Sequence, residues 1–183
     1  MKILFISLGC DKNLADSEEM LGLLTGNGHE IVDSEEEADA IVINTCCFIH
    51  DAKEESVNTI LEMAEYKKTG TCKILIVTGC MAQRYKEEIT KEIPEVDAVL
   101  GTTSYGDIVK ALNEAEAGHV FQEFKDINAL PEDSGRRVIT TGGHFGYLKI
   151  AEGCDKHCTY CIIPSLRGKF RSVPEERLLK QAE

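Results

Sequence analysis

The chain has 183 residues, of which 43% are hydrophobic, and this is enough to bury one globular core and to begin a second domain. No apolar run approaches the roughly 20 residues that a membrane-spanning helix needs, and the first residues form a short apolar strand without the basic region or cleavage site of a signal peptide. We therefore expect a cytoplasmic protein without a membrane partner.

The net charge of −12 argues against nucleic acid as the main partner, because nucleic-acid binding draws its affinity from Lys and Arg. Residues 1–143 hold 13 basic and 27 acidic side chains, a net charge of −14, whereas residues 144–183 hold 7 and 5, a net charge of +2. The acidic part suits a basic protein partner. For any single acidic run, such as residues 35–37, solvation of an acidic surface is the simpler explanation.

The first half of the chain alternates apolar runs of strand length with helical patterns. Residues 2–8 form a continuous apolar run, which is typical of a strand buried on both faces in a parallel sheet. Cys10 follows, and residues 14–25 then carry apolar side chains at helical spacing, with Asp16 or Ser17 as the expected cap.

A strand followed by a helix recurs along the chain, and this order of elements predicts an α/β fold with an open doubly wound parallel sheet. The expected strands are residues 31–32, 40–44, 73–78 and 98–100, and the expected helices are residues 51–68, 84–93 and 108–117.

Cys10, Cys46 and Cys80 each follow an apolar strand by two residues, and we refer to them as the strand-end cysteines. The carboxyl ends of parallel strands meet at one edge of a sheet, where ligands gather. If the three strands are near neighbours, the thiols converge on one point. The alternative is three unrelated buried residues, which is how we interpret Cys47 and Cys72.

Residues 121–143 have no sustained period and are rich in turn residues, which predicts a linker. A strand is expected over residues 145–150, and Pro174 is expected to open a last helix. The predicted organisation is an amino-terminal domain (residues 1–120), the linker (residues 121–143) and the incomplete start of a second α/β domain (residues 144–183).

Cys154, Cys158 and Cys161 stand in a compact loop, and we refer to them as the loop cysteines. Soft thiolates select iron–sulfur clusters, zinc or Cu(I), and a structural zinc site would want a fourth protein ligand. His157 lies inside the loop and is poorly placed to supply it. Three ligands around an iron with an open position fit better, although a reduced structural metal knuckle is the simpler alternative.

The spacing of the loop cysteines, with Tyr160 just before the last of them, resembles the radical S-adenosylmethionine enzymes. The resemblance implies that S-adenosylmethionine chelates the open iron of a 4Fe-4S cluster, that the reduced cluster cleaves it to a 5′-deoxyadenosyl radical, and that Tyr160 lies near the adenine.

With both cysteine sets in view, the whole chain resembles the methylthiotransferases, a family of radical S-adenosylmethionine enzymes. The resemblance implies that the strand-end cysteines bind an auxiliary 4Fe-4S cluster that carries or donates sulfur, while the loop cysteines bind the radical-generating one. The motifs that carry it are Ser7-Leu8-Gly9-Cys10, Asn44-Thr45-Cys46, Thr78-Gly79-Cys80 and the loop Cys154, Cys158 and Cys161.

Within the family, residues 7–13, 16–18 and 46–49 look like the branch that methylthiolates an aspartate of a small-subunit ribosomal protein. This implies that protein and an electron donor as partners. The alternatives are a transfer-RNA adenosine methylthiotransferase and a non-catalytic metal-binding fragment. A nucleotide-binding fold is disfavoured because the first turn lacks the glycines that let phosphates approach a helix.

The family's enzymes continue through a full radical-domain barrel, so we expect this chain to be an amino-terminal fragment that is inactive alone. The basic residues Arg167, Lys169 and Arg171 would contact S-adenosylmethionine or substrate, or form a solvated loop face, and the latter is the simpler interpretation.

Overall fold

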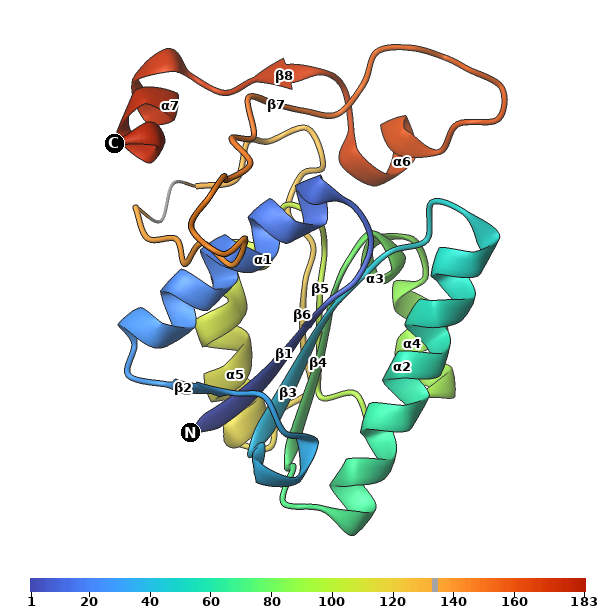
Figure 1. The fold of residues 1–183 in the computed structure, drawn as a ribbon. Coiled ribbons are helices and arrows are strands. Elements are labelled where there is room, and N and C mark those ends of the chain that lie inside the picture. Colours follow the sequence, from blue (N-terminus) through green and yellow to red (C-terminus); the bar gives the residue numbers. More distant parts are fainter. Residues whose placement is uncertain (133–134) are drawn as a thin grey trace.

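A computed structural model of the chain describes residues 1–132 and 135–183 and contains a six-stranded parallel sheet with helices on both faces (Figure 1). The strands stand in the order β2-β1-β3-β4-β5-β6, and every neighbouring pair is parallel. This confirms the predicted open doubly wound α/β sheet. The strands are β1 (Lys2–Ser7), β2 (Glu30–Val32), β3 (Ala40–Thr45), β4 (Ile74–Gly79), β5 (Ala98–Leu100) and β6 (Phe121–Glu123).

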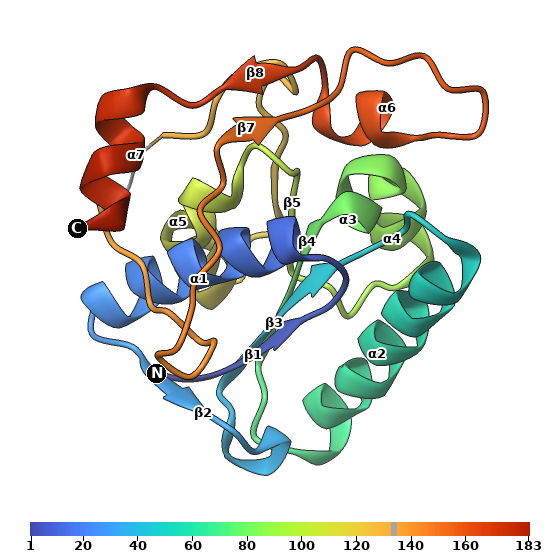
Figure 2. The same ribbon diagram turned by 45° about the horizontal axis from the view of Figure 1, so that its top comes forward.

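Two groups of helices sandwich the sheet (Figures 1 and 2). Helices α1 (Asp11–Gly26) and α5 (Ile108–Glu116) cover one face, and short 3-10 turns lie at residues 35–37 and 105–107. The other face carries α2 (His50–Thr69), α3 (Cys80–Arg84) and α4 (Lys86–Glu92).

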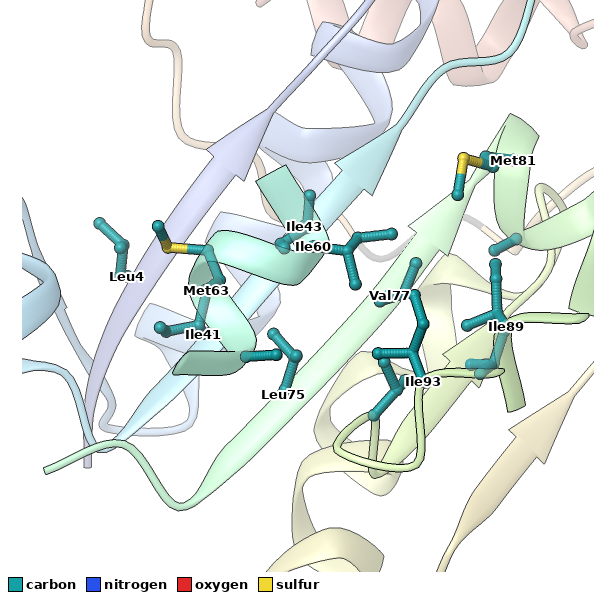
Figure 3. Close-up of a cluster of buried hydrophobic side chains, with 14 of the residues drawn as sticks. Leu4, Ile41, Ile43, Ile60, Met63, Leu75, Val77, Met81, Ile89 and Ile93 are labelled. Atoms are coloured by element: carbon teal, nitrogen blue, oxygen red, sulfur yellow. The ribbon is translucent and has the colours of Figure 1, made fainter. Parts of the chain in front are cut away.

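The central strands are buried on both faces, which explains their unbroken apolar runs. On one face, Ile41 and Ile43 of β3 and Leu75 of β4 pack against Ile60 of α2 (Figure 3). The alternate residues of the same strands pack beneath α1 and α5, because successive side chains of a strand point to opposite faces. Both hydrophobic layers therefore depend on β3 and β4.

Two predicted helix boundaries in this region are wrong. Helix α1 begins at Asp11 rather than near residue 14, so Asp16 and Ser17 lie inside it and are buried instead of capping it. The helix expected over residues 84–93 is α4, but it begins only at Lys86, because Tyr85, with a ψ of 33°, interrupts the helical backbone after the short helix α3, which the sequence pattern did not predict.

The carboxyl-terminal part lies across the edge of the sheet where the strands end (Figure 1). It consists of an antiparallel pair, β7 (Ala151–Glu152) and β8 (Arg171–Ser172), and of α6 (Ile163–Arg167) and α7 (Glu175–Ala182). The helix predicted after Pro174 is confirmed. The strand predicted over residues 145–150 is not formed, because this stretch crosses the outside of α1 without a partner strand and its backbone enters β7 only at Ala151 (Figure 2).

Strand β6 lies within the stretch for which the sequence predicts a linker, and its apolar Phe121 pairs with Ala98. Two other residues of that stretch, Asp133 and Ser134, lie outside the described residues. Across the part of the chain that the structure describes, no helix combines the length and the apolar character needed to cross a membrane.

Candidate metal centre

The strand-end cysteines follow three strands that lie side by side. Cys10 follows β1, Cys46 follows β3, and Cys80 directly follows β4. The order β1-β3-β4 satisfies the condition on which their convergence depends. In addition, α1 leaves β1 toward one face and α2 leaves β3 toward the other (Figure 1), and ligands of open α/β sheets bind at such a reversal of direction.

One pocket of about 1060 Å³ opens at this edge, and all the strand-end cysteines line it together with Cys154. Its walls are mostly apolar. Leu8, Phe48, Ile49, Ile163 and Leu166 contribute to them. All eight cysteines lie in the described part of the chain and are free thiols, so no disulfide competes for the sulfur atoms.

Glycines let the cysteine turns approach one another closely. Gly9 has a φ of +96°, and a Cβ atom on it would stand 2.7 Å from Cβ and 3.0 Å from Sγ of Cys46. Gly79 has a φ of +93°, and a Cβ atom there would stand 2.3 Å from Oδ1 of Asn44. Any other residue would force the turns apart as well as straining the backbone.

Asn13, on the first turn of α1, ties the three cysteine turns together. Its side-chain amide donates to the carbonyl oxygens of Leu8 at 3.0 Å and Thr45 at 2.9 Å. Its Oδ1 atom accepts from Sγ of Cys80 at 3.7 Å. A single buried amide thus contacts the segments that carry Cys10, Cys46 and Cys80, and nothing in the residue spacing indicated this role.

The environment of the buried thiols favours their neutral form. Burial raises the pKa of Cys80, and the guanidinium group of Arg167 opposes that rise. Burial together with the neighbouring Cys80 raises the pKa of Cys47 to about 12. Cys47 and Cys72 are both buried, as predicted, and neither lines the pocket.

The loop cysteines are more open to solvent. Cys154 and Cys161 are half-buried and Cys158 is exposed. The backbone N–H of Cys161 donates to the carbonyl of Cys158 at 3.0 Å, and that of Cys154 donates to the carbonyl of Gly168 at 3.0 Å. Only Cys154 of this set lines the main pocket, and Tyr160 points away from the interior with 89% of its surface exposed.

The strand-end cysteines have the donor chemistry of an iron–sulfur cluster, because such clusters are held by Cys thiolates. Three free thiols from separate turns line one apolar pocket. Over the described ranges, no group of three or more His, Cys, Asp or Glu side chains is arranged to hold a single metal ion.

A buried group of charges, which we refer to as the charge cluster, joins α1 to the carboxyl-terminal part: it consists of Asp16, Lys149, Glu152 and Arg167. Arg167 Nη1 donates to Asp16 Oδ2 at 2.7 Å, and Lys149 Nζ lies 2.7 Å from Glu152 Oε1 and also pairs with Asp16. Burial alone would lower the pKa of Lys149 and of Arg167, but Asp16 and the other anionic neighbours hold both above their ordinary values.

The expected environment of Arg167 is therefore wrong. Its side chain is only 6% exposed and is hydrogen-bonded to protein acceptors, so it is not a solvated loop residue. It lines the main pocket beside the strand-end cysteines. Lys169 is exposed, and Arg171 donates to the backbone carbonyls of Arg167 and of Ala129. The sequence signal that could have indicated this environment is the presence of acidic residues on α1 together with the excess of basic over acidic residues in residues 144–183.

Comparisons with known proteins find a family model and several relatives that match the chain. The family model described as "Uncharacterized protein family UPF0004" matches residues 2–101. The chain is 66% identical over 183 residues to the "Ribosomal protein uS12 methylthiotransferase RimO" of Lachnoclostridium phytofermentans, covering all of this chain and 42% of that protein. It is 51% identical to the protein of the same name from Clostridioides difficile and 49% identical to that of Trichlorobacter lovleyi, covering all of this chain and 41% of each. The chain thus spans about two fifths of the length of these relatives.

Proposed function

The chain belongs to the protein family UPF0004, and we propose that it is the amino-terminal part of a methylthiotransferase that modifies an aspartate of ribosomal protein uS12 by radical S-adenosylmethionine chemistry. Relatives that match this chain over its full length carry the name of that activity. One structural observation carries the proposal: Cys10, Cys46 and Cys80, from three separate turns, line one pocket together with Cys154 of the other cysteine set.

In this proposal the strand-end cysteines hold an auxiliary 4Fe-4S cluster and the loop cysteines hold a second one at the start of a radical S-adenosylmethionine domain within residues 144–183. When bound, these groups and S-adenosylmethionine would supply the radical chemistry and the sulfur. Because Cys154 and the strand-end cysteines share a pocket, the chain itself supplies the proximity that a short-lived reactive species requires.

The protein contributes a largely apolar pocket that opens at the sheet edge. Phe48, Ile49, Ile163 and Leu166 line the pocket and restrict water around the reacting groups. Tyr160, which is exposed on the loop, is placed in the proposal as a contact for the adenine of S-adenosylmethionine.

The proposed protein substrate is basic ribosomal protein uS12, which the names of the relatives specify for those relatives. The net charge of −14 over residues 1–143 favours such a partner over transfer RNA. An electron donor is a further proposed partner. All eight cysteines are free thiols, which is typical of a reducing compartment, and we therefore place the protein in the cytoplasm.

Anaerobic reconstitution of the chain with iron and sulfide tests the cluster assignments. We expect about eight irons per chain, falling to about four in the variant Cys154→Ala/Cys158→Ala/Cys161→Ala, because each four-iron cluster depends on its own cysteine set. The variant Cys47→Ala/Cys72→Ala is the matched control and should keep about eight irons. Uptake of zinc alone, or of no iron, would contradict the proposal.

A further inference from the structure

We propose that Arg167 is a positioning residue of the strand-end cysteine site, which it orders through Asn13 and supports with a buried positive charge. The inference rests on the proposed function, because it assumes that this site holds an auxiliary iron–sulfur cluster. It concerns a residue that follows the other cysteine set, six positions after Cys161. Arg167 would thereby join the two cysteine sets into one unit.

The guanidinium group reaches both elements at once. Nη2 of Arg167 donates to Oδ1 of Asn13 at 2.6 Å. Nη1 donates to Asp16 Oδ2 at 2.7 Å and to Glu152 Oε1 at 3.3 Å. A planar fork with donors in fixed directions serves these acceptors from two nitrogen atoms, whereas a lysine would have to reach all of them from one.

Asn13 connects the guanidinium group of Arg167 to the three cysteine turns. The same Oδ1 atom that accepts from Arg167 also accepts from Sγ of Cys80, and the amide nitrogen holds the carbonyls of Leu8 and Thr45. Because Oδ1 is fixed by Arg167, the amide cannot flip and its nitrogen must face the two carbonyls. Loss of the guanidinium group would release all three cysteine turns at their common contact.

The backbone that carries Arg167 is itself anchored on the sheet. Leu166 is buried in the hydrophobic cluster beneath α3, and its carbonyl accepts from Oγ1 of Thr102 at 2.8 Å. The side chain of Arg167 is therefore held by packing on one side and by hydrogen bonds on the other. This is the kind of support that tunes a metal site from outside its ligands.

The charge of Arg167 matters because it is buried beside Cys80 together with two carboxylates, Asp16 and Glu152. In this interior, electrostatic interactions are stronger than in water. Without the guanidinium charge, Lys149 would be the one cation left beside Asp16 and Glu152 apart from Lys12, which lies 4.0 Å from Glu152, and the surroundings of the cysteine site would become more negative. A cluster bound there would then be harder to reduce.

A simpler role for Arg167 is to hold the carboxyl-terminal part onto α1. Arg137 provides the control for that role, because it also pairs with a buried carboxylate of α1, that of Glu18, but contacts neither Asn13 nor any cysteine. Removing Arg137 weakens the attachment and leaves the cysteine site untouched.

The experiment uses the reconstituted chain with Cys154→Ala/Cys158→Ala/Cys161→Ala as background, so that only the strand-end site contributes a signal. The reduction potential of its cluster and the affinity for iron in competition with a chelator are measured for Arg167→Gln, Arg167→Lys and Arg137→Gln. Arg167→Lys keeps the positive charge, so the net charge of the charge cluster does not change. This variant therefore separates the loss of the guanidinium geometry from unfolding caused by unpaired buried carboxylates.

We expect iron affinity to fall by about tenfold or more in both Arg167 variants, as is common when the support of metal ligands is removed. The potential should become more negative, by a larger shift in Arg167→Gln than in Arg167→Lys, whereas Arg137→Gln should match the background. An unchanged potential in both Arg167 variants, or an equal shift in Arg137→Gln, would overturn the inference. A background chain that takes up no iron would instead overturn the proposed function and the inference with it.

Discussion

Glu18 of α1 and Arg137, which are 119 residues apart in the sequence, form a two-pronged ion pair inside the protein, with Oε2 accepting from Nε at 2.9 Å and from Nη2 at 2.5 Å. The other carboxylate oxygen accepts from both the backbone N–H and the hydroxyl of Thr140. The side chain of Glu18 is fully buried, and Arg137 and Thr140 donate the hydrogen bonds that its carboxylate accepts. A stretch that the sequence describes as a linker is therefore fastened to α1.

We expect Glu18→Ala to lower the free energy of unfolding by about 3 kcal/mol, because removing one partner leaves a buried arginine charge uncompensated. Glu37→Ala is the matched control: its carboxylate also pairs with a cation, Lys2, but on the surface. Urea denaturation of both variants measures the difference. Equal midpoints for the two variants would contradict the burial argument.

The order of strands and helices along the chain follows from the sequence because it depends on local patterns, whereas the order in which the strands lie side by side in the sheet does not. Continuous apolar runs such as residues 40–44 indicate strands buried on both faces, and the intervening periodic segments indicate crossover helices. The same reasoning fails for residues 145–150. That run is also apolar, but a strand needs a neighbour to pair with, and a neighbour is a property of the whole fold rather than of the segment.

The cysteines of the site could be predicted and their supporting residues could not. Strand ends place Cys10, Cys46 and Cys80 at one edge once the topology is known. Asn13 and Arg167 are one asparagine and one arginine among many, and their roles arise from a contact between segments 154 residues apart. An acidic residue near the expected start of a helix is ordinarily assigned to capping, so the pattern gives no sign that Asp16 is buried against Arg167.

Gly9→Ala should disrupt the strand-end site, because the added Cβ atom would overlap Cys46 and the residue has a φ of +96°. Gly28→Ala is the control: Gly28 has a φ of +84°, and no atom lies within 4 Å of an added Cβ. Both variants carry backbone strain, but only the first pushes Cys46 aside. We expect a loss of about four irons in reconstituted Gly9→Ala and none in Gly28→Ala, and equal iron contents would refute the steric explanation.

Alkylation of the iron-free chain should follow the burial of the thiols. With iodoacetamide at pH 8, Cys10 and Cys158 are exposed and should be modified first, whereas Cys72 and Cys47 should be modified last. The pKa of Cys47, raised by burial to about 12, leaves only about one thiol in ten thousand ionised at that pH. Mass spectrometry of quenched samples gives the order. Early labelling of Cys47 would contradict the structure, and uniform labelling in urea provides the control.

Glu152 should make the stability of the chain depend on pH in the acid range. Burial alone would raise the pKa of Glu152, but Lys149 and Arg167 outweigh it and hold the pKa below its ordinary value. As the pH falls, the unfolded chain therefore takes up this proton before the folded one does. The contribution of the ionised carboxylate is fully present above the unfolded pKa of about 4.3 and is lost as the pH falls through the lower, folded pKa.

The difference between the chain and its Glu152→Gln variant isolates this effect, since Glu19, whose pKa burial raises, is present in both and cancels. At pH 7 the variant should be less stable by about 3 kcal/mol, because two buried cations lose a carboxylate partner. Urea denaturation midpoints measured from pH 7 downward should begin to converge near pH 4, where the unfolded glutamate takes up its proton, and should meet only below the lower pKa of the folded chain. A difference that stays constant through this range would show that the carboxylate acts through its shape and hydrogen bonds rather than through its charge.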